Sequence, residues 1–469
     1  EELSTGYPTI QELTTYVRMA KKLKAKLWNN NITISLNPWT TLYHVSRGRK
    51  LKADQNFTLM TGETGVKSLI TACPLCLNWQ KYLCDTFSYL AAEVEPYAIW
   101  IEDDWRLHNH GVNLGWGGCF CQIHLSRFAD KVGCYIGREQ LLKIILAPSK
   151  PHPWRAIWLQ ICRDSLLEPA KKLFDAVNKV VPSVRLGLMS SSPDAHSIEG
   201  RDWDALEKAL DGENLPFLIR PHLPPYTETT AIKTPPSITR QTLANLRRPI
   251  EVYPELESSP RSGPYSKSSA CALWQCFNSA VYGSQGITIN HFDMMGNGIA
   301  LDQNFGKSLA KAKPQLNALS KLKIDDQNSE GIHVLFSPQV SLYKHVDRTS
   351  SLRGLYNDST IWSKVLYTLG ISHKFIKDIE PTPNPYVVNC ETLRAFNDEQ
   401  IQTLLSGKVL LDAISVTILL ERGFGEMIGI EDANWQLQKQ TGFSYESVCE
   451  DNPSIFGLAN PRMTTQRCA

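Results

Sequence analysis

The amino-acid sequence predicts an α/β protein: a (β/α)8 barrel of the TIM type, followed by a smaller doubly wound α/β domain. Two observations carry this prediction. Segments with helical periodicity alternate with short β-rich runs from the start of the chain to about residue 300, which is typical of a parallel sheet with crossover helices. Polar, aromatic and acidic residues follow directly after the predicted strands, where barrel enzymes place their active sites.

The predicted barrel strands are short runs rich in β-branched and aromatic residues, and helical periodicity fills the segments between them. The strand runs span residues 32–36, 68–71, 97–101, 184–188, 216–219, 250–253 and 286–290, and the main helices span residues 10–27, 79–92, 154–180, 202–210 and 267–282. These are seven strands where the fold has eight. We therefore expect the first strand, which would precede residue 10, to be absent, divergent or supplied by other means.

The sequence divides into four parts. The barrel is predicted over residues 1–304, a helical and Lys-rich connector over 305–328 and the second α/β domain over 329–430, whereas residues 431–469 show no clear period. In the second domain, strands are predicted at residues 332–336, 386–389 and 408–411, and helices at 360–369, 398–405 and 415–422. This domain lacks a Gly-rich phosphate-binding fingerprint, so we expect no nucleotide site in it.

Composition excludes several classes of partner. The formal net charge is +2, charged residues make up 20% of the chain and no block of like charges occurs, so we expect no nucleic-acid partner. No apolar run approaches the ~20 residues of a membrane span. The 12 cysteines are dispersed, which does not suit a disulfide scaffold. No signal peptide is visible at Glu1, and the compartment stays open.

Two clusters of acidic residues follow predicted strands. The run Glu102-Asp103-Asp104 follows the third predicted strand, and Glu255 and Glu257 follow the sixth; with the missing strand counted, these are strands four and seven. Hydrolysis of a glycosidic bond requires two carboxyl groups, one to protonate the leaving oxygen and one to attack carbon or activate water. The clusters favour this chemistry, and the alternative is that these acids are solvated loop residues.

Strand alternation sorts the acids only in part. It places Glu255 and Glu257 on the same side of an extended chain, so it cannot separate them. The same alternation pairs Glu102 with Asp104 and leaves Asp103 on the opposite side. Adjacent carboxylates raise the pKa of one partner, which would let a member of the triplet hold its proton near neutral pH.

The run Leu256-Glu257-Ser258-Ser259-Pro260 resembles the strand-seven pattern of the family 42 β-galactosidases, which belong to clan A of the glycoside hydrolases. The resemblance implies a retaining β-glycosidase with Glu257 as nucleophile and Glu255 as the alternative. The resemblance also implies that catalysis needs no cofactor. The aromatic helix around Trp274 is also similar to that family.

The strand-four motif departs from the family. The family has Asn followed by the acid/base Glu, where this chain has Asp103 and Asp104. Glu102 has the longer reach and the usual chemistry for a retaining enzyme, so we expect Glu102 to be the acid/base, with Asp104 as the alternative. Because the family's Asn binds the sugar 2-hydroxyl, its replacement by Asp103 suggests a modified or differently configured sugar.

Further polar residues lie just beyond predicted strand ends and could contact the substrate. Arg106 and Arg261 would suit an anionic sugar such as a uronate or sulfate. Each of these residues, taken alone, is also compatible with a surface or packing role. The candidate substrate-binding residues are Asp103, Asp104, Arg106, His108, His110, His222, Tyr226, His291 and Asp293.

A cysteine motif suggests a metal. Cys119-Phe120-Cys121 and His124 resemble the zinc-binding run of the same family, with His124 in place of its last Cys, and Cys73 stands where the family has its upstream ligand. Three Cys and one His form an ordinary tetrahedral zinc set, which would be structural because all four positions are filled. The alternative is that these cysteines are small buried side chains or redox partners.

The second domain resembles the flavodoxin-like domain that follows the barrel in this family, in Tyr386-Val387-Val388, in residues 407–412 and in residues 422–425. In the family this domain packs between subunits, so the resemblance implies a homotrimer. It covers most of residues 10–430.

Two other functions stay open. In the first, the barrel is a metal-dependent enzyme whose catalytic divalent ion is bound by Glu102, Asp104, His108, His110 and Asp293. In the second, it is a degenerate barrel that binds carbohydrate or a protein partner without catalysis. The lost Asn-Glu pair and the missing first strand favour this second alternative.

Overall fold

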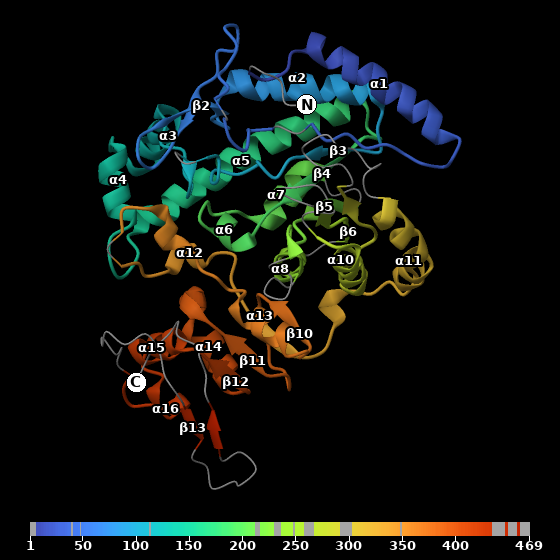
Figure 1. Cartoon of the computed structure of the whole chain (residues 1–469). Coiled ribbons are helices and arrows are strands. Elements are labelled where there is room, and N and C mark those ends of the chain that lie inside the picture. Colours follow the sequence, from blue (N-terminus) through green and yellow to red (C-terminus); the bar gives the residue numbers. More distant parts are fainter. Residues whose placement is uncertain are drawn as a thin grey trace.

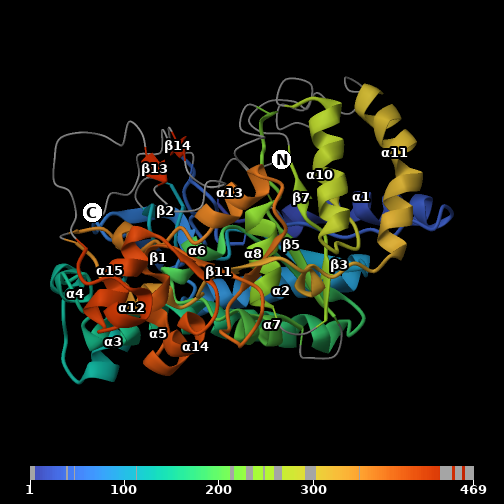
Figure 2. The same ribbon diagram turned by 90° about the horizontal axis from the view of Figure 1, so that it is seen from below.

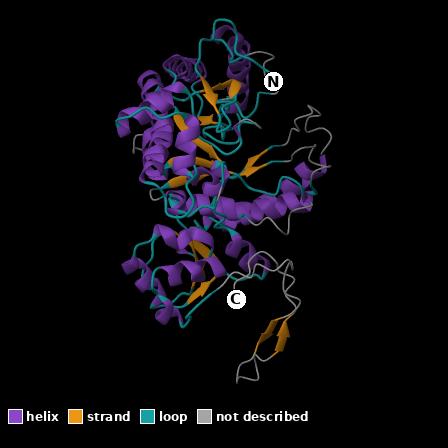
Figure 3. Cartoon of the chain, turned by 90° about the vertical axis from the view of Figure 1, so that its left-hand side faces the viewer, coloured by secondary structure: helices purple, strands orange, loops and turns teal. Residues whose placement is uncertain are grey.

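The computed structural model describes most of the chain (Figure 1). The described residues are 6–38, 41–46, 48–111, 114–211, 216–228, 236–246, 249–257, 267–290, 303–347, 349–433, 446–448 and 457–459. They form a larger unit around one parallel sheet and a smaller unit around a second, and Figures 1 and 3 show the smaller unit below the larger. None of the helices among these residues is long and apolar enough to cross a membrane.

The sheet of the larger unit is parallel, as the alternation of elements predicts. Its strands are ordered β3 (Ala98–Ile101), β4 (Arg185–Ser190), β5 (Phe217–Pro221) and β6 (Ile250–Val252). An isolated parallel bridge from Leu36 to Ile99 extends one edge. At the other edge, a bridge from His222 to Glu255 joins β7 (Glu255–Leu256), which pairs in parallel with β8 (Thr288–Ile289). Within the described residues this sheet is an open, curved run of strands.

One predicted barrel strand is wrong. Residues 68–71 lie in β2 (Lys67–Ala72), which pairs with β1 (Leu59–Thr61) in an antiparallel hairpin outside the parallel sheet. The chain between the two strands is too short for a crossover connection, and Gly65, with φ of +85°, takes the left-handed conformation that the tight turn needs. A run of apolar residues could not distinguish this hairpin from a barrel strand.

Side chains alternate across the parallel sheet. Ile99 and Ile101 of β3 belong to the main hydrophobic core under the helices, whereas Ala98 and Trp100 face the other side and pack with Met189. Gly187 of β4 makes room for this arrangement, because a Cβ there would lie 2.5 Å from the Trp100 ring. One face of the sheet is therefore covered by helices, whereas the opposite face carries Trp100 and Met189. The acidic residues follow the carboxyl ends of these strands.

Helices cover the sheet as the sequence predicts. Long helices α2 and α5 pack on each other, α7 packs on α5, and Figure 2 shows α10 and α11 side by side. The helices of the larger unit are α1 (Ile10–Trp28), α2 (Leu77–Val94), α3 (Gln122–Val132), α4 (Arg138–Ile145), α5 (Pro153–Val180), α6 (Pro193–Ser197), α7 (Trp203–Asp211), α8 (Ser237–Asn245), α10 (Ser269–Val281) and α11 (Gln303–Lys321).

The smaller unit contains a four-stranded parallel sheet, ordered β10 (His373–Ile376), β9 (Ile332–Leu335), β11 (Tyr386–Val388) and β12 (Val409–Leu411). Sequence analysis missed β10, a short strand between two turns. In chain order the arrangement is 2-1-3-4, which equals the first four positions of one common doubly wound order. Its helices are α12 (Val340–Tyr343), α13 (Ile361–Thr368), α14 (Asp398–Leu405), α15 (Ala413–Glu421) and α16 (Gly425–Ile428), with 3-10 turns η4 (Asp326–Asn328), η5 (Leu352–Leu355) and η6 (Cys390–Ala395).

The segment without clear period contains a short antiparallel pair, β13 (Glu446–Val448) and β14 (Gly457–Ala459).

Several buried polar contacts join the two units, and one of them centres on a carboxylate. Asp194 of α6 accepts hydrogen bonds from the Ser359 backbone N–H at 2.9 Å, the Ser359 hydroxyl at 2.7 Å and the Gln241 amide at 2.8 Å. This network connects α6 and α8 to the loop before α13.

We expect Asp194→Ala to lower the free energy of unfolding by about 3 kcal/mol, because it leaves buried donors without acceptors. Urea denaturation checks this. Asp85→Ala is the matched control, since Asp85 forms an exposed ion pair with Lys81 within one helix and should cost below about 0.5 kcal/mol. Equal losses in the two variants would contradict the role given to Asp194.

Candidate active site

Charged side chains from three parallel strands meet at the carboxyl edge of the larger sheet, because parallel strands bring these ends together. Asp103 follows β3, His222 follows β5 and Glu255 lies in β7. The His222 imidazole stands between the two acids, with Nε2 at 2.7 Å from Asp103 Oδ2 and 3.7 Å from Glu255 Oε2. The predicted strand-four and strand-seven acids are thus close neighbours.

Asp103 is the ionised centre of this cluster. Arg106 Nη1 lies 2.8 Å from its Oδ2, and His44 Nε2 contacts its Oδ1. Burial raises the pKa of Asp103, but Arg106, His222 and His44 outweigh burial and hold this pKa well below its usual range. Three cationic groups thus fix the orientation of one carboxylate.

Glu102 is the protonated member of the cluster. Its Oε2 accepts a hydrogen bond from the Asn37 amide at 2.8 Å, and its Oε1 lies 3.8 Å from His44 Nε2. Burial, followed by the negative charge of Asp103, raises the pKa of Glu102 to about 8, although His44 and Asn37 oppose this. Glu102 therefore holds its proton at neutral pH, which is what a general acid requires.

Asp104 points away from this pair. Its Oδ2 accepts three backbone hydrogen bonds, from Thr41 at 2.8 Å, Leu42 at 2.9 Å and Tyr43 at 2.8 Å, and the side chain is fully buried. Tyr43 has φ of +73°, so these bonds hold a turn that is unfavourable for a non-glycine residue. The geometry favours Asp104 as the anchor of the loop that carries His44.

The side chains of Glu102, Asp103 and Asp104 do not alternate as they would in a strand. Alternation pairs Glu102 with Asp104, but β3 ends at Ile101 and the next residues form a turn, so two-residue periodicity no longer applies. The turn brings Asp103 to the side of Glu102, and His44 contacts both.

The strand-seven acids differ in their surroundings. Glu255 is buried and forms an ion pair through Oε1 with Arg220 Nη2. Glu257, two residues later, is half-buried, and burial and the Glu255 charge raise its pKa. The phenol of Tyr226 senses both acids: burial, followed by the negative charges of Glu255 and Glu257, raises its pKa.

His108 and His110, predicted to contact substrate or metal, lie inside the loop after β3. His108 Nδ1 is 3.1 Å from Glu199 Oε2, and His110 is held between the carbonyl oxygens of Tyr43 and Arg106. Burial lowers the pKa of both, that of His110 to about 3. Both imidazoles are thus buried and engaged with groups of the protein.

The ligand set proposed for a catalytic ion does not converge among the described residues. His108 gathers with His196 and Glu199, whereas Glu102 gathers with His44 and Asp103. Three predicted residues, Arg261, His291 and Asp293, lie outside the part of the chain that the structure describes.

Sequence analysis missed three members of the cluster. Asn37 and Arg220 stand at the ends of their strands, and this position was the available signal. His44 lies in a loop, and the hydrogen bonds from the preceding turn to Asp104 help to bring it to the acids.

The predicted zinc ligands are brought together. Cys73, Cys119, Cys121 and His124 are buried, and their ligand atoms lie within 4.8 Å of one another. Cys121 Sγ is 3.5 Å from Cys73 Sγ and from His124 Nδ1, and Cys73 Sγ is 3.4 Å from His124 Nδ1. Such spacings fit the edges of a tetrahedron around zinc, with Zn–S of about 2.3 Å and Zn–N of about 2.0 Å.

No protein-family model matches the chain, and no curated protein matches its sequence. Solved structures do match. The β-galactosidase of Rahnella sp. R3 is 13% identical with a TM-score of 0.52, over 83% of this chain and 60% of its own. That of Marinomonas ef1 is 11% identical with a TM-score of 0.56, over 83% and 66%. A catalytic mutant of a GH42 β-galactosidase from G. stearothermophilus is 11% identical with a TM-score of 0.54, over 85% and 64%.

At these identities the likeness establishes a shared fold. This chain spans about 60% of the length of the Rahnella enzyme. The chain has parallel α/β sheets and shares the fold of these enzymes, which confirms the α/β class that the sequence predicts; the complete eight-stranded barrel and the flavodoxin-like second domain stay predictions.

The raised pKa of Glu102 makes stability depend on pH. Between the ordinary value of 4.5 and about 8, the folded chain holds a proton that the unfolded chain has released, so stability falls as pH rises. Glu102→Gln removes this proton-linked loss of stability. We therefore expect the free energy of unfolding of the variant, relative to that of the wild type, to increase by about 1 kcal/mol for each pH unit from about pH 5 to about pH 7.5. Urea denaturation at several pH values measures this difference.

Glu168→Gln is the control for this series. Burial of Glu168 is outweighed by Lys172 and Arg127, which lower its pKa, so it titrates below the tested range. A Glu102→Gln variant whose difference from wild type stays constant with pH would contradict the protonated state.

Proposed function

We propose that this chain is a retaining glycoside hydrolase acting on a β-galactoside-like carbohydrate. The observation that carries the proposal is that Glu102, whose pKa is raised, and Glu255 belong to one charged cluster at the same edge of the sheet, connected through His44, Asp103 and His222. In glycoside hydrolases, two carboxyl groups whose environments separate their pKa values are typical of a general acid and a nucleophile. The fold shared with β-galactosidases is consistent with this chemistry.

In the proposed mechanism Glu102 donates its proton to the glycosidic oxygen, while a strand-seven carboxylate attacks the anomeric carbon and the bond to the leaving group breaks. Glu102, now ionised, then removes a proton from water. That water displaces the glutamate from the sugar, which restores both side chains and retains the anomeric configuration.

We propose Glu257 as the nucleophile and Glu255 as the alternative. Glu257 is the less buried of the two and matches the resemblance, whereas Glu255 is already engaged with Arg220 and close to His222. The negative charge of Glu255 makes the Glu257 carboxylate more basic, which favours attack once it is ionised.

The cluster favours a neutral sugar. Arg106 is already engaged with the Asp103 carboxylate and with the carbonyl oxygen of His108 at 3.1 Å, so its guanidinium is not free for a uronate or sulfate. We propose that Asp103, which is ionised and buried beside Arg106, His222 and His44, accepts a hydrogen bond from a sugar hydroxyl.

Four variants test the assignment on nitrophenyl β-glycosides, galactosides first. Glu102→Gln should lower kcat/KM by about 10²–10⁴-fold, the usual contribution of a general acid. Glu257→Gln should abolish turnover and Glu255→Gln should retain part of it. Asp104→Asn keeps the acceptor oxygen and should retain activity within about tenfold, because we assign it an anchoring role.

Product stereochemistry by NMR checks retention, and kcat/KM should fall as pH rises past about 8, where Glu102 loses its proton. Inversion, or full activity in both Glu257→Gln and Glu255→Gln, would contradict the mechanism. A sugar that binds without hydrolysis would instead favour the degenerate barrel.

A second candidate is a metal-assisted hydrolase. The observation that favours it is that His44, Glu102 and Asp103 offer ligand atoms within 4.8 Å of one another. Activity lost on treatment with EDTA and restored by a divalent ion would support it. Activity that survives EDTA would exclude it in favour of the two-carboxylate mechanism.

We also propose a structural zinc at Cys73, Cys119, Cys121 and His124. When bound, it would tie the hairpin of β1 and β2 to the start of α3. We expect one zinc per chain by mass spectrometry, lost in Cys121→Ser together with thermal stability. Cys134→Ser is the control, because Cys134 is exposed and outside the set. Zinc retained in Cys121→Ser would contradict the assignment.

The smaller unit we propose to be flavodoxin-like, on the strand order 2-1-3-4. The resemblance further implies a homotrimer, which sedimentation equilibrium can measure.

A further inference from the structure

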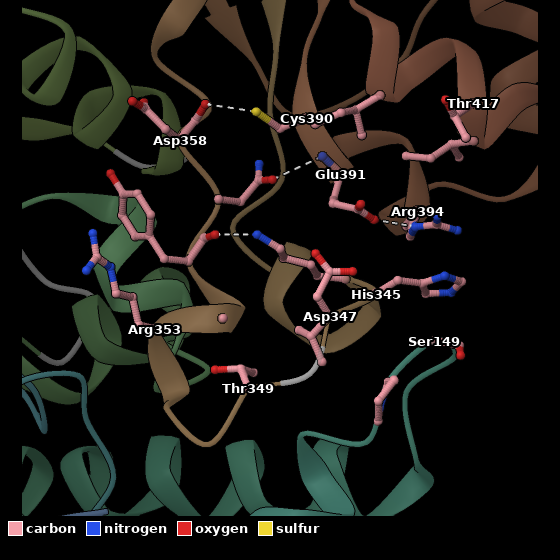
Figure 4. Close-up of a pocket in the computed structure, with 18 of the residues that line it drawn as sticks. Ser149, His345, Asp347, Thr349, Arg353, Asp358, Cys390, Glu391, Arg394 and Thr417 are labelled. Atoms are coloured by element: carbon pink, nitrogen blue, oxygen red, sulfur yellow. Dashed lines mark hydrogen bonds and ion pairs between the residues drawn. The ribbon is translucent and has the colours of Figure 1, made fainter. Parts of the chain in front are cut away.

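A cavity of about 940 Å³ is lined mostly by residues of the smaller unit (Figure 4). The loop at 344–358 and the start of η6 form its walls, α15 closes one side, and Ser149 of the larger unit reaches its rim. None of the residues that line this cavity belongs to the carboxylate cluster of the larger sheet.

The cavity lies at a position in the smaller sheet where proteins of this architecture bind ligands. The strand order reverses between β9 and β11, and in open parallel sheets ligands bind outside the carboxyl ends of the strands at such a switch point. Cys390 and Glu391, which line the cavity, follow β11 directly, and the loop at 344–358 follows β9 and α12.

The chemistry of the walls disfavours an anion. The backbone N–H groups of Cys390 and Glu391, which a phosphate would need, already donate to Asp412 Oδ2 at 2.7 Å and Asn357 Oδ1 at 3.1 Å. Among the ionisable side chains of the walls, four carboxylates face three cationic groups. These are Asp347, Asp358, Glu391 and Glu421, and Lys344, Arg353 and Arg394.

Many of these charges are balanced within the protein. Arg394 contacts Glu391 and lies 2.8 Å from Glu421, and Asp358 lies 3.0 Å from Lys364. Charged groups paired in this way present hydrogen-bond donors and acceptors without attracting a counter-ion, which suits hydroxyl groups.

The thiol of Cys390 does not act as a nucleophile here. Burial raises its pKa to about 11, so the reactive thiolate is scarce at neutral pH. The cavity also has an aromatic side, since Tyr356 lines it and packs edge-on against Trp116, with ring centroids 5.7 Å apart. Aromatic faces suit the apolar faces of sugar rings.

We propose that this cavity is a second, non-catalytic binding site for a neutral saccharide. The class of ligand rests on the proposed function, whereas the exclusion of anions rests on the walls alone. The site would hold one part of an oligosaccharide or a separate chain while hydrolysis occurs elsewhere.

The test is isothermal titration calorimetry with neutral β-linked galactotriose, cellotriose and xylotriose, with ADP as the anionic comparison. The background is Glu257→Gln, the variant that we expect to abolish turnover. Thr417→Trp fills the cavity from α15 without removing a charge. Thr403→Trp on α14 is the matched control, because both threonines donate to the carbonyl oxygen four residues earlier, at 2.9 Å and 3.0 Å.

We expect two saccharides per chain, one after Thr417→Trp and two after Thr403→Trp, with unchanged circular dichroism melting and no heat from ADP. A second outcome separates the two proposals. If the wild type shows no turnover and the protein binds a single saccharide that Thr417→Trp abolishes, the binding site in the cavity is supported and the proposed hydrolase activity is contradicted. Stoichiometry unaffected by Thr417→Trp, no binding of any trisaccharide, or ADP bound in the cavity would overturn the inference.

Discussion

The arrangement of the acidic cluster depends on one buried charge, the Asp103 carboxylate. It draws Arg106, His222 and His44 to one point, and these side chains come from the loop after β3, the end of β5 and the loop after Leu36. A buried carboxylate with fewer cationic partners would be protonated or would destabilise the fold. The ionic cluster therefore joins three segments that are distant in sequence.

Burial, followed by that charge, raises the pKa of Glu102 and keeps it protonated. Two adjacent carboxyl groups in a buried site cannot both ionise at low cost, and Asp103 has the cations. Asp104 contributes indirectly, because it holds the turn at 41–43 and so places His44. Three consecutive acids thus have three different environments: one protonated, one ionised and one bonded to the backbone.

Supporting residues surround the cluster on its far side. Glu199 accepts hydrogen bonds from the Leu107 backbone at 2.7 Å and lies 2.9 Å from Arg201 and 2.9 Å from His196. Burial opposes ionisation of Glu199, but Arg201 and His108 outweigh it and hold its pKa well below the usual range. This second buried ion cluster stabilises the loop that carries Arg106, so the site is preorganised by charges that do not themselves face it.

The sequence by itself determined the parallel α/β fold, the edge of the sheet where the acids gather, and the four residues of the cysteine-histidine cluster. Periodicity and strand-end position indicate the first two features because these depend on local spacing, whereas the cysteine-histidine set rests on its resemblance to the zinc-binding run of the family 42 β-galactosidases. Tertiary structure alone decided that residues 68–71 form a hairpin, that His108 and His110 are buried and engaged with groups of the protein, and that Asp103 joins Glu102 while Asp104 turns away. Those outcomes depend on contacts between segments far apart in the sequence, such as His222 with Asp103, and on which carboxylates gain the few buried cationic side chains. The local sequence does not determine which of the adjacent carboxylates binds these cationic side chains.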